Sequence, residues 1–453
     1  MPLPGGPMNW SAGRMVEKRP VLLSLYRAAA QGVSPLFHVL FGLRSRSSKE
    51  IPARKGERFG RSDLARPAGS LIWIHAASVG ETMSVLPLID VLTGDGHAVL
   101  LTTVTVTASE LAEKRLPDGA FHQFVPYDAP VPLNRFLEHW SPDLAMVVES
   151  EIWPCLFDEM HGRNVPFVLL NGRLSDGSLR NWSRVPYISR FIFRCLDLVL
   201  AQSPADAERF EKLGCHDVKV PGNLKFDAPE PAVDDEAITV LQAQIGERRI
   251  WVAALTHPGE DEIVFDAYKR LRQEFPDLLL VLVPRHPARA QDVIDLAAAS
   301  DLSLVSRSSQ QPVTPETEIF LGDTLGEMGL YYRLSPVTFL GGSFADVGGH
   351  NPVEAALSGS ALVTGPKVAN ARAVYKEFWS NGAAVRVQDP TKLANEVGEL
   401  FRNPEKIHRQ IETARALVEA GRGALDKSLA LLQPLLNGDR AKRLQETADE
   451  QIT

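Results

Sequence analysis

Acidic side chains follow apolar segments in the first half of the sequence, and they could take part in proton transfer. Glu81 ends the stretch His75–Glu81, which comes after a predicted strand and opens a predicted helix. A carboxylate in the first turn of a helix complements the helix dipole, and it could instead serve as a general base toward a substrate hydroxyl. The sequence leaves both interpretations open, and the helix dipole is the simpler one.

A second pair of acids, Glu149 and Glu151, follows another buried segment. On an extended backbone they point the same way, and two like charges on one face need a cation or a function to compensate them. One acid could cap the helix that begins at Pro154, while the other could pair with Arg173 or Arg180. Capping accounts for only one of the two acids.

Lys225 lies in Pro221–Asp227, just before a segment rich in proline and acid. Most lysines are solvated. If Lys225 points inward instead, it supplies a positive charge for an anionic substrate or a departing phosphate.

Three loops in the second half also follow predicted strands: Pro284–His286, Gly322–Met328 and Gly341–Glu354. A glycine-rich loop that enters a helix exposes N–H groups to phosphate, and an acid inside that helix can accept hydrogen bonds from ribose hydroxyls. Together the three loops indicate a nucleotide site. The spacings GxxxxGK[ST] and GxGxxG are missing at the positions that a P-loop ATPase or a dinucleotide-dependent oxidoreductase would require, and no HExxH or Asp/His cluster indicates a metal.

These residues need a scaffold, and the sequence alternates between short aliphatic runs and amphipathic stretches. In the first half we predict strands at Leu71–His75, Ala98–Thr103, Leu144–Glu149, Phe167–Asn171 and Leu198–Ala201, and in the second half at Ile250–Ala254, Leu278–Val283, Leu302–Val305, Glu318–Leu321, Val337–Leu340 and Ala361–Thr364. This alternation predicts an α/β protein with two Rossmann-like domains, each a parallel sheet covered on both faces. Ligands of such sheets bind beyond the carboxyl ends of the strands, so we expect a cleft between the domains.

The expected organisation has four parts. They are an N-terminal membrane-associating segment with a basic strip (1–66), a first Rossmann-like domain (67–228), a second Rossmann-like domain with the three glycine-rich or basic loops (229–436) and a polar C-terminal tail (437–453). Residues 227–236, rich in proline, alanine and acid, form the linker.

The composition limits the function. The chain has 453 residues and a net charge of −8, which suits two or three soluble domains and argues against a general nucleic-acid-binding surface. Its three cysteines are far apart, so neither a disulfide framework nor a structural zinc site is indicated.

The N-terminal region departs from that acidic average. Residues 21–43 are largely apolar but interrupted by polar residues, and residues 44–66 carry eight Lys or Arg against three acids. A spanning helix needs about 20 predominantly apolar residues. We therefore expect either a monotopic anchor, with the basic run on an anionic membrane surface, or a helix packed on the protein; the two are nearly equally favoured.

Eight sequence blocks between about residues 70 and 380 carry a family resemblance. They are WIHAASVGE, ESEIWP, NGRLSDGS, GNLKFD, THPGEDE, VPRHP, DTLGEMGLYY and GGSFADVGGHNPVEAA. In this order they resemble the 3-deoxy-D-manno-octulosonic acid (Kdo) transferases of lipopolysaccharide synthesis.

The resemblance implies a two-domain glycosyltransferase of the GT-B type that needs no metal or other cofactor. It implies transfer of Kdo from CMP-Kdo to the lipid A precursor, lipid IVA, at the cytoplasmic face of the cell inner membrane. By motif position, Glu81 resembles the catalytic base, and Glu149 and Lys225 resemble residues that stabilise the transition state. The residues that resemble the CMP-binding positions are Pro284, Arg285, His286, Leu325, Gly326, Glu327, Asn351, Pro352, Val353 and Glu354.

The sequence departs from the family pattern at Cys155, Ala288 and Ala355, where Asn, an acid and Pro are usual. These departures put the acceptor preference in doubt but remove no proposed catalytic charge. Two alternatives stay open: a transferase for another nucleotide sugar, such as a UDP-sugar, and a non-catalytic lipid- or nucleotide-binding protein.

Overall fold

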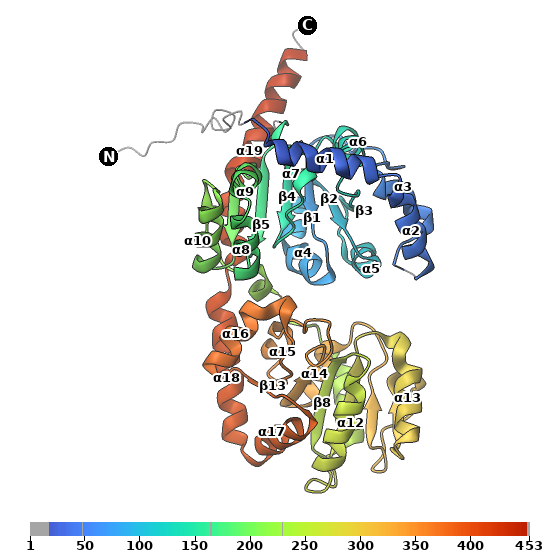
Figure 1. Ribbon diagram of the computed structural model, residues 1–453. Helices are drawn as coiled ribbons and strands as arrows, with labels where there is room; N and C mark the ends of the chain where they lie inside the picture. The colour runs from blue at the N-terminus through green and yellow to red at the C-terminus, as the bar shows by residue number, and fades with distance from the viewer. Residues whose placement is uncertain (1–17, 48, 164, 229, 451–453) are drawn as a thin grey trace, which may run out of the picture. The chain divides into compact units, whose positions relative to one another are not determined.

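The computed structural model describes residues 18–450 apart from 48, 164 and 229; the side chains of 370, 373 and 438–450 also lie outside the description. The chain forms two compact units (Figure 1). Unit 1 comprises Met1–Asp227 and Arg422–Thr453, and unit 2 comprises Ala228–Gly421.

Unit 1 is built on a seven-stranded parallel sheet with the order β3-β2-β1-β4-β5-β6-β7. The strands are β1 (Leu71–His75), β2 (Ala98–Thr103), β3 (Ala120–Phe124), β4 (Leu144–Val148), β5 (Phe167–Gly172), β6 (Leu198–Ala201) and β7 (Val218–Lys219). The helices are α1 (Val21–Val33), α2 (Leu36–Arg46), α3 (Lys55–Arg58), α4 (Val79–Gly94), α5 (Val106–Arg115), α6 (Pro130–Trp140), α7 (Pro154–His161), α8 (Asp176–Ser183), α9 (Pro186–Phe193), α10 (Pro204–Leu213) and α19 (Ala424–Glu450), with short 3₁₀ turns η2 (Pro52–Arg54) and η3 (Leu224–Asp227).

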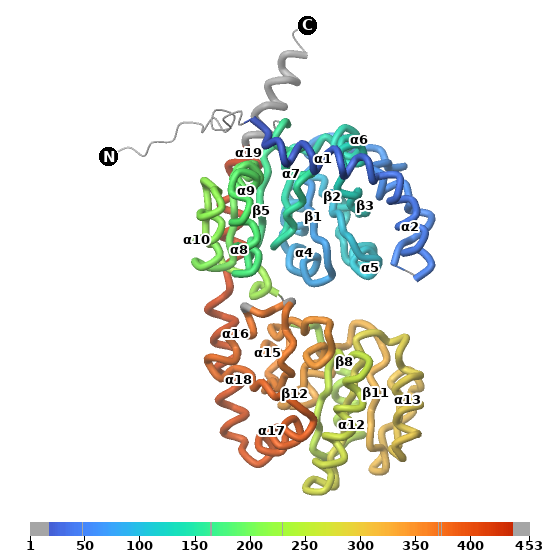
Figure 2. Tube along the Cα trace, viewed as in Figure 1, coloured from blue at the N-terminus to red at the C-terminus, as the bar shows by residue number. Residues whose placement is uncertain are grey.

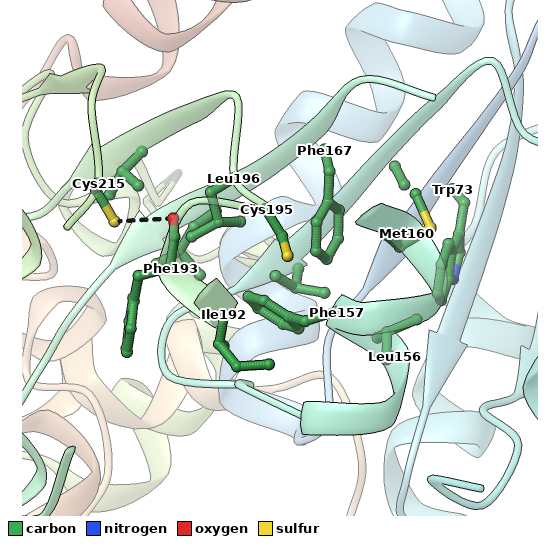
Figure 3. Close-up of a cluster of buried hydrophobic side chains, with 14 of the residues drawn as sticks. Trp73, Leu156, Phe157, Met160, Phe167, Ile192, Phe193, Cys195, Leu196 and Cys215 are labelled. Atoms are coloured by element: carbon green, nitrogen blue, oxygen red, sulfur yellow. Dashed lines mark hydrogen bonds between the residues drawn. The ribbon is translucent and has the colours of Figure 1, made fainter. Parts of the chain in front are cut away.

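Both faces of this sheet are buried because successive side chains of each strand enter opposite cores. In β1, Leu71 and Trp73 join one apolar cluster, whereas Ile72 and Ile74 join the other. Figure 3 shows the first cluster, in which Trp73 lies with aromatic and aliphatic side chains of α7 and α9. Burial on both faces explains why these strands are continuous hydrophobic runs.

Unit 2 repeats the plan with the order β10-β11-β9-β8-β12-β13-β14, again all parallel. Its strands are β8 (Ile250–Thr256), β9 (Leu279–Pro284), β10 (Leu304–Ser306), β11 (Ile319–Leu321), β12 (Val337–Leu340), β13 (Ala361–Thr364) and β14 (Ala384–Arg386). Its helices are α11 (Asp235–Ile245), α12 (Glu260–Leu271), α13 (Ala290–Ala299), α14 (Met328–Leu334), α15 (Val353–Leu357), α16 (Arg372–Asn381), α17 (Pro390–Arg402) and α18 (Pro404–Gly421), with 3₁₀ turns η4 (Pro287–Arg289), η5 (Arg307–Ser309) and η6 (Ala369–Ala371). The predicted α/β fold with two Rossmann-like sheets is confirmed.

Every strand predicted from the sequence is present, with ends shifted by at most two residues. The sequence missed β3, β7 and β14. Each of these lies at an edge of its sheet. An edge strand has one neighbour and partial exposure, so its residues need no unbroken apolar run.

The C-terminal boundary differs from the expected one. We expected the second domain to continue to residue 436, but the chain returns to unit 1 at Arg422. There Leu432, Leu435 and Leu436 of α19 share a core with Leu224 and Ile72, which explains the return. The expected polar tail, 437–453, lies almost wholly outside the described side chains.

At the N-terminus, α1 packs against α6 and leads into α2 (Figure 2). Leu23 and Phe41 point inward and are buried, and Arg27 forms ion pairs with Asp158 and Glu159 of α7. Among the helices that the structure describes, none is long and apolar enough to cross a bilayer.

The basic strip, residues 44–66, presents less unpaired positive charge than its sequence suggests. Arg58 is buried and pairs with Glu50, to which Arg44 also binds. Arg54 pairs with Glu57, and in the same strip Arg66 bonds to Asp143. Arg66 thus ties the strip to the rest of unit 1. The other three arginines pair with acids of the strip itself, so these positive charges already have partners within the protein.

Candidate active site

Glu81 lies in the first turn of α4, and its half-buried carboxylate is close to other acids. Its carboxylate accepts hydrogen bonds from the Ala77 N–H (2.8 Å) and the Ser78 hydroxyl (2.9 Å). Ser78 is the N-cap of the helix, and its hydroxyl oxygen accepts the N–H of Glu81 (3.4 Å), so the two residues together cap the start of α4. Burial, followed by the charges of Glu149 and Glu151, raises the pKa of Glu81 to about 8, although both hydrogen bonds lower it. Glu81 is thus a capping residue whose pKa also suits proton transfer near neutral pH.

Glu149 follows β4 directly and forms an ion pair with Lys225. Both residues are buried, with exposed fractions of 7% and 9%. The solvated alternative for Lys225 is therefore wrong, and the ammonium of Lys225 is a cation that compensates the charge of Glu149. The backbone of Glu149 is left-handed (φ 56°), so the segment is not extended as we expected.

Glu151 has different partners from Glu149. It accepts a hydrogen bond from the Trp153 indole N–H (2.7 Å) and lies 3.9 Å from Nε2 of His75. Burial raises the pKa of Glu151, but these contacts outweigh burial and hold it below the usual value. Neither acid caps α7, because the carboxylate of Asp128 accepts the N–H groups at the start of that helix.

In unit 2, the glycine-rich loop after β12 is organised by a buried acid. The carboxylate of Glu260 accepts the N–H groups of Gly342 (2.6 Å), Phe344 (2.8 Å) and Ala345 (3.3 Å). Gly341 is required there, since a Cβ would lie 2.7 Å from the Leu255 carbonyl oxygen. These N–H groups already bind a protein carboxylate, so our expectation that they cradle a phosphate is wrong for these three positions.

Two of the predicted nucleotide-binding loops lie together with histidines. Nε2 of His257 and Nε2 of His350 are 3.0 Å apart, and the His257 and His286 rings are in edge contact. Burial, then the charge of Arg285, lowers the pKa of His350 to about 3. Burial lowers the pKa of His257 as well. Neutral imidazoles can form hydrogen bonds with an anion, and the neighbouring arginine attracts its negative charge.

The Asn351–Glu354 segment lies beside these histidines, because it directly follows His350. The side-chain oxygen of Asn351 accepts the Val353 N–H (3.4 Å), and Pro352 and Val353 are buried. Glu354 occupies the first turn of α15, and both Glu354 and Arg285 act electrostatically on the buried Tyr332 hydroxyl. The structure therefore brings Asn351–Glu354 close to Pro284–His286.

The Leu325–Glu327 loop is organised separately. Glu327 forms an ion pair with Arg307 (2.8 Å) and accepts a hydrogen bond from the Thr324 hydroxyl. The hydrogen bond from Arg307 holds the pKa of Glu327 below its usual value. Leu325 is exposed and Gly326 is left-handed (φ 86°).

Across the residues that the structure describes, no group of three or more His, Cys, Asp or Glu side chains is placed to hold a metal ion. The three cysteines, at 155, 195 and 215, are free and buried. Figure 3 shows Cys195 and Cys215 within the apolar core, where the Cys215 thiol bonds to the Phe193 carbonyl.

Four residues near the candidate site had no role predicted from the sequence: His257, Glu260, His350 and Asn171. All four stand within blocks that carry the family resemblance, THPGEDE, GGSFADVGGHNPVEAA and NGRLSDGS. Their position within those blocks could have indicated that they belong to the site. Their contacts could not be predicted, because the strand ends that carry them meet only in the fold.

Comparisons with known proteins identify the family and the fold. A family model described as 3-deoxy-D-manno-octulosonic-acid transferase (kdotransferase) matches residues 53–228. A 3-deoxy-D-manno-octulosonic acid transferase of Haemophilus influenzae is 34% identical over 417 residues, 89% of this chain and 96% of the relative. One of Bordetella pertussis is 33% identical over 427 residues, 91% and 99% of the two chains. The crystal structure of a glycosyltransferase from Rickettsia africae shares the fold, with a TM-score of 0.54 and 14% identity over 82% of this chain and 99% of that one.

Proposed function

The chain belongs to the Kdo transferase family, a family of GT-B glycosyltransferases, and from this premise we propose that it transfers Kdo from CMP-Kdo to lipid IVA in lipopolysaccharide biosynthesis. The observation that carries the proposal is the half-buried Glu81, whose pKa is raised to about 8 by burial and by the charges of Glu149 and Glu151. A carboxyl with a pKa near neutrality is suited to take a proton from a sugar hydroxyl.

In the proposed reaction Glu81 acts as the general base. Its carboxylate takes the proton of the acceptor hydroxyl while the hydroxyl oxygen forms a bond to the anomeric carbon of Kdo. The bond from that carbon to the phosphate oxygen breaks, and its electron pair leaves with CMP. A single displacement of this kind inverts the anomeric centre.

Fixed charges take the place of a metal in this proposal. Lys225 supplies an ammonium for the negative charge that develops on the departing phosphate, and Glu149 holds that ammonium in place. Arg285 and His286, with Asn351–Glu354, bind the CMP group, and Leu325–Glu327 contributes the third loop.

We place the protein at the cytoplasmic face of the inner membrane through α1 and α2. These helices are fixed to unit 1 yet expose a row of apolar side chains: Val21, Leu22, Leu25, Tyr26, Val33, Leu36, Val39, Leu40 and Leu43. A cavity of about 710 Å³ at the start of α1 has an apolar lining with three cations, Lys18, Arg184 and Arg190, and its lining includes no acid. An apolar row beside cations suits an interfacial position on anionic lipid. The proposal combines the two alternatives for the N-terminus, because α1 and α2 pack on unit 1 and also expose apolar side chains on their outer face.

The direct test is mass spectrometry of lipid IVA after incubation with CMP-Kdo and the purified protein. We expect product heavier by one or more Kdo residues, and much slower product formation with Glu81→Gln. Calorimetric titration with CMP and UDP identifies the nucleotide. Binding of UDP without CMP, or no Kdo added to lipid IVA, would contradict the proposal.

Membrane binding is tested by flotation with vesicles that contain phosphatidylglycerol. We expect Leu22→Glu combined with Leu40→Glu to reduce the bound fraction severalfold, because each change places a charge on the exposed row. Val240→Glu, at an exposed apolar position on α11, is the matched control. Equal binding of all three proteins would show that the row does not contact the membrane.

A further inference from the structure

Two neighbouring strands of unit 1 end in the same unusual backbone conformation. β4 and β5 are paired, with Val148 opposite Leu170, and the next residues are Glu149 (φ 56°) and Asn171 (φ 53°). The register of β5 against β6 shifts at this point, between Leu169 and Gly172. Left-handed residues other than glycine are uncommon and cluster at functional sites.

The side chain of Asn171 is buried and tied to a distant segment. Its carboxamide oxygen accepts the N–H of Leu224 at 3.1 Å, across 53 residues of chain. The exposed fraction of Asn171 is 1%, and its backbone carbonyl accepts a hydrogen bond from the Gln202 amide (3.1 Å). The carboxamide is therefore held in one orientation toward η3.

Leu224 begins η3, and Lys225 is the next residue. A 3₁₀ turn of four residues has few internal hydrogen bonds, so contacts from outside decide where it lies. Two such contacts flank Lys225: Asn171 holds the N–H before it, and the Asn223 side chain accepts the N–H of Lys225 itself (3.1 Å). The ammonium then reaches Glu149, one strand away from Asn171.

We infer that Asn171 is a positioning residue for Lys225: through the Leu224 N–H it sets η3 so that the Lys225 ammonium meets the Glu149 carboxylate. The inference rests on the proposed function, because it treats Lys225 as the charge that stabilises the departing phosphate. Asn171 itself takes no part in bond making.

A purely structural role for Asn171 makes a different prediction. It would lower the free energy of unfolding and the amount of active enzyme, while the turnover number of the folded molecules stayed unchanged. A positioning role lowers kcat in the folded enzyme and leaves the binding of CMP to unit 2 unchanged.

The variant that separates the two is Asn171→Gly. Glycine adopts the left-handed conformation freely, so the change removes the carboxamide without adding backbone strain. We expect kcat to fall roughly 10- to 100-fold, because a misplaced charge near the reacting atoms loses much of its effect. The Kd for CMP, by calorimetry, should match that of the unchanged protein.

Ser141→Gly is the matched control. Ser141 is also a left-handed residue of unit 1 (φ 39°), but it ends α6 and precedes β4, at the opposite end of that strand from Glu149. Its replacement should leave kcat unchanged, which separates the general effect of a new glycine from the loss of the Asn171 contact.

A double-mutant cycle with Lys225→Met completes the test. If Asn171 acts through Lys225, then Asn171→Gly lowers kcat in the natural background but not in Lys225→Met. Equal losses in both backgrounds, or no loss in either, would overturn the inference. If Lys225→Met itself leaves kcat unchanged, the proposed role of Lys225 fails; a crystal structure of Asn171→Gly then decides the inference, which is overturned if Lys225 still contacts Glu149.

Discussion

The predicted sites of the two units use opposite electrostatics. Unit 1 gathers three carboxylates, Glu81, Glu149 and Glu151, of which Glu149 pairs with the buried Lys225, and the pKa of Glu81 is raised. Unit 2 gathers imidazoles beside Arg285, and the pKa values of His257 and His350 are lowered. Burial acts in both places, but it disfavours a negative group in the first and a positive group in the second.

This difference assigns different tasks to the two units. A carboxyl whose proton is lost near neutral pH can accept a proton from a substrate. Neutral imidazoles beside Arg285 can accommodate a phosphate, and the carboxylate of the nearby Glu260 is already bound by backbone N–H groups. We therefore expect changes in unit 1 to affect turnover and changes in unit 2 to affect nucleotide binding.

The largest effect should come from Glu81→Gln. Loss of a general base typically costs 10²- to 10⁴-fold in rate, so we expect transfer to fall by about that factor in a mass-spectrometric rate assay. Calorimetry should show unchanged CMP binding. Turnover close to that of the natural enzyme would contradict the assignment of the chemical step to unit 1.

Arg285→Ala should weaken CMP binding roughly 10- to 100-fold, since a hydrogen bond to a charged group contributes about 1.5–3 kcal/mol. At saturating CMP-Kdo, kcat should change little. Arg333→Ala removes a half-exposed arginine of unit 2 that pairs with Glu230, and it serves as the control. An unchanged Kd for CMP in Arg285→Ala would exclude Arg285 from the nucleotide site.

The pH dependence of turnover should sharpen the assignment of Glu81. Because the base works in its deprotonated form and its pKa is about 8, kcat should rise roughly tenfold between pH 7 and pH 9. The negative charge of Glu149 contributes to the raised pKa, so in Glu149→Gln the midpoint should move to lower pH. A rate that is flat over this range, or a midpoint that moves upward in Glu149→Gln, would contradict the role of Glu81.

The smallest effect is expected for Glu354→Ala, about three- to tenfold in the Kd for CMP, because a single hydrogen-bonding partner of the ribose is lost. The chemical step should change less than binding. A nucleotide without the 2′ and 3′ hydroxyls provides the control, since Glu354→Ala should not weaken its binding further. A Kd for CMP equal to that of the natural protein would refute the ribose role.

Regular features of the fold were predictable from the sequence. The buried strands are apolar on both faces and stand out against amphipathic helices, so the central strands of both sheets were found. Edge strands such as β7 were missed because partial exposure removes the apolar run. The return of α19 to unit 1 was also missed, since a helix pattern indicates an apolar face but not the core that receives it.

The candidate sites likewise have features that could be predicted from the sequence and features that could not. Residue type and position singled out Glu81 and Glu149 after predicted strands and Lys225 before the linker, and the structure brings Lys225 and Glu149 into contact. The partner of a buried charge could not be predicted, because Lys225 lies 76 residues from Glu149 along the sequence. The binding of loop N–H groups by Glu260 was unpredictable for the same reason, as it joins segments 82 residues apart.

The carboxylate of Asp227 has a consequence for engineering the protein. It accepts the N–H groups of Gly423 (2.7 Å) and Leu425 (2.6 Å), so the two points where the chain leaves and re-enters unit 1 are bonded to each other. Unit 2 is topologically an insertion with adjacent ends. Residues 228–421 should therefore be replaceable by a short glycine linker, which would give unit 1 as a single continuous chain, whereas a truncation at residue 421 would strip α19 from its core.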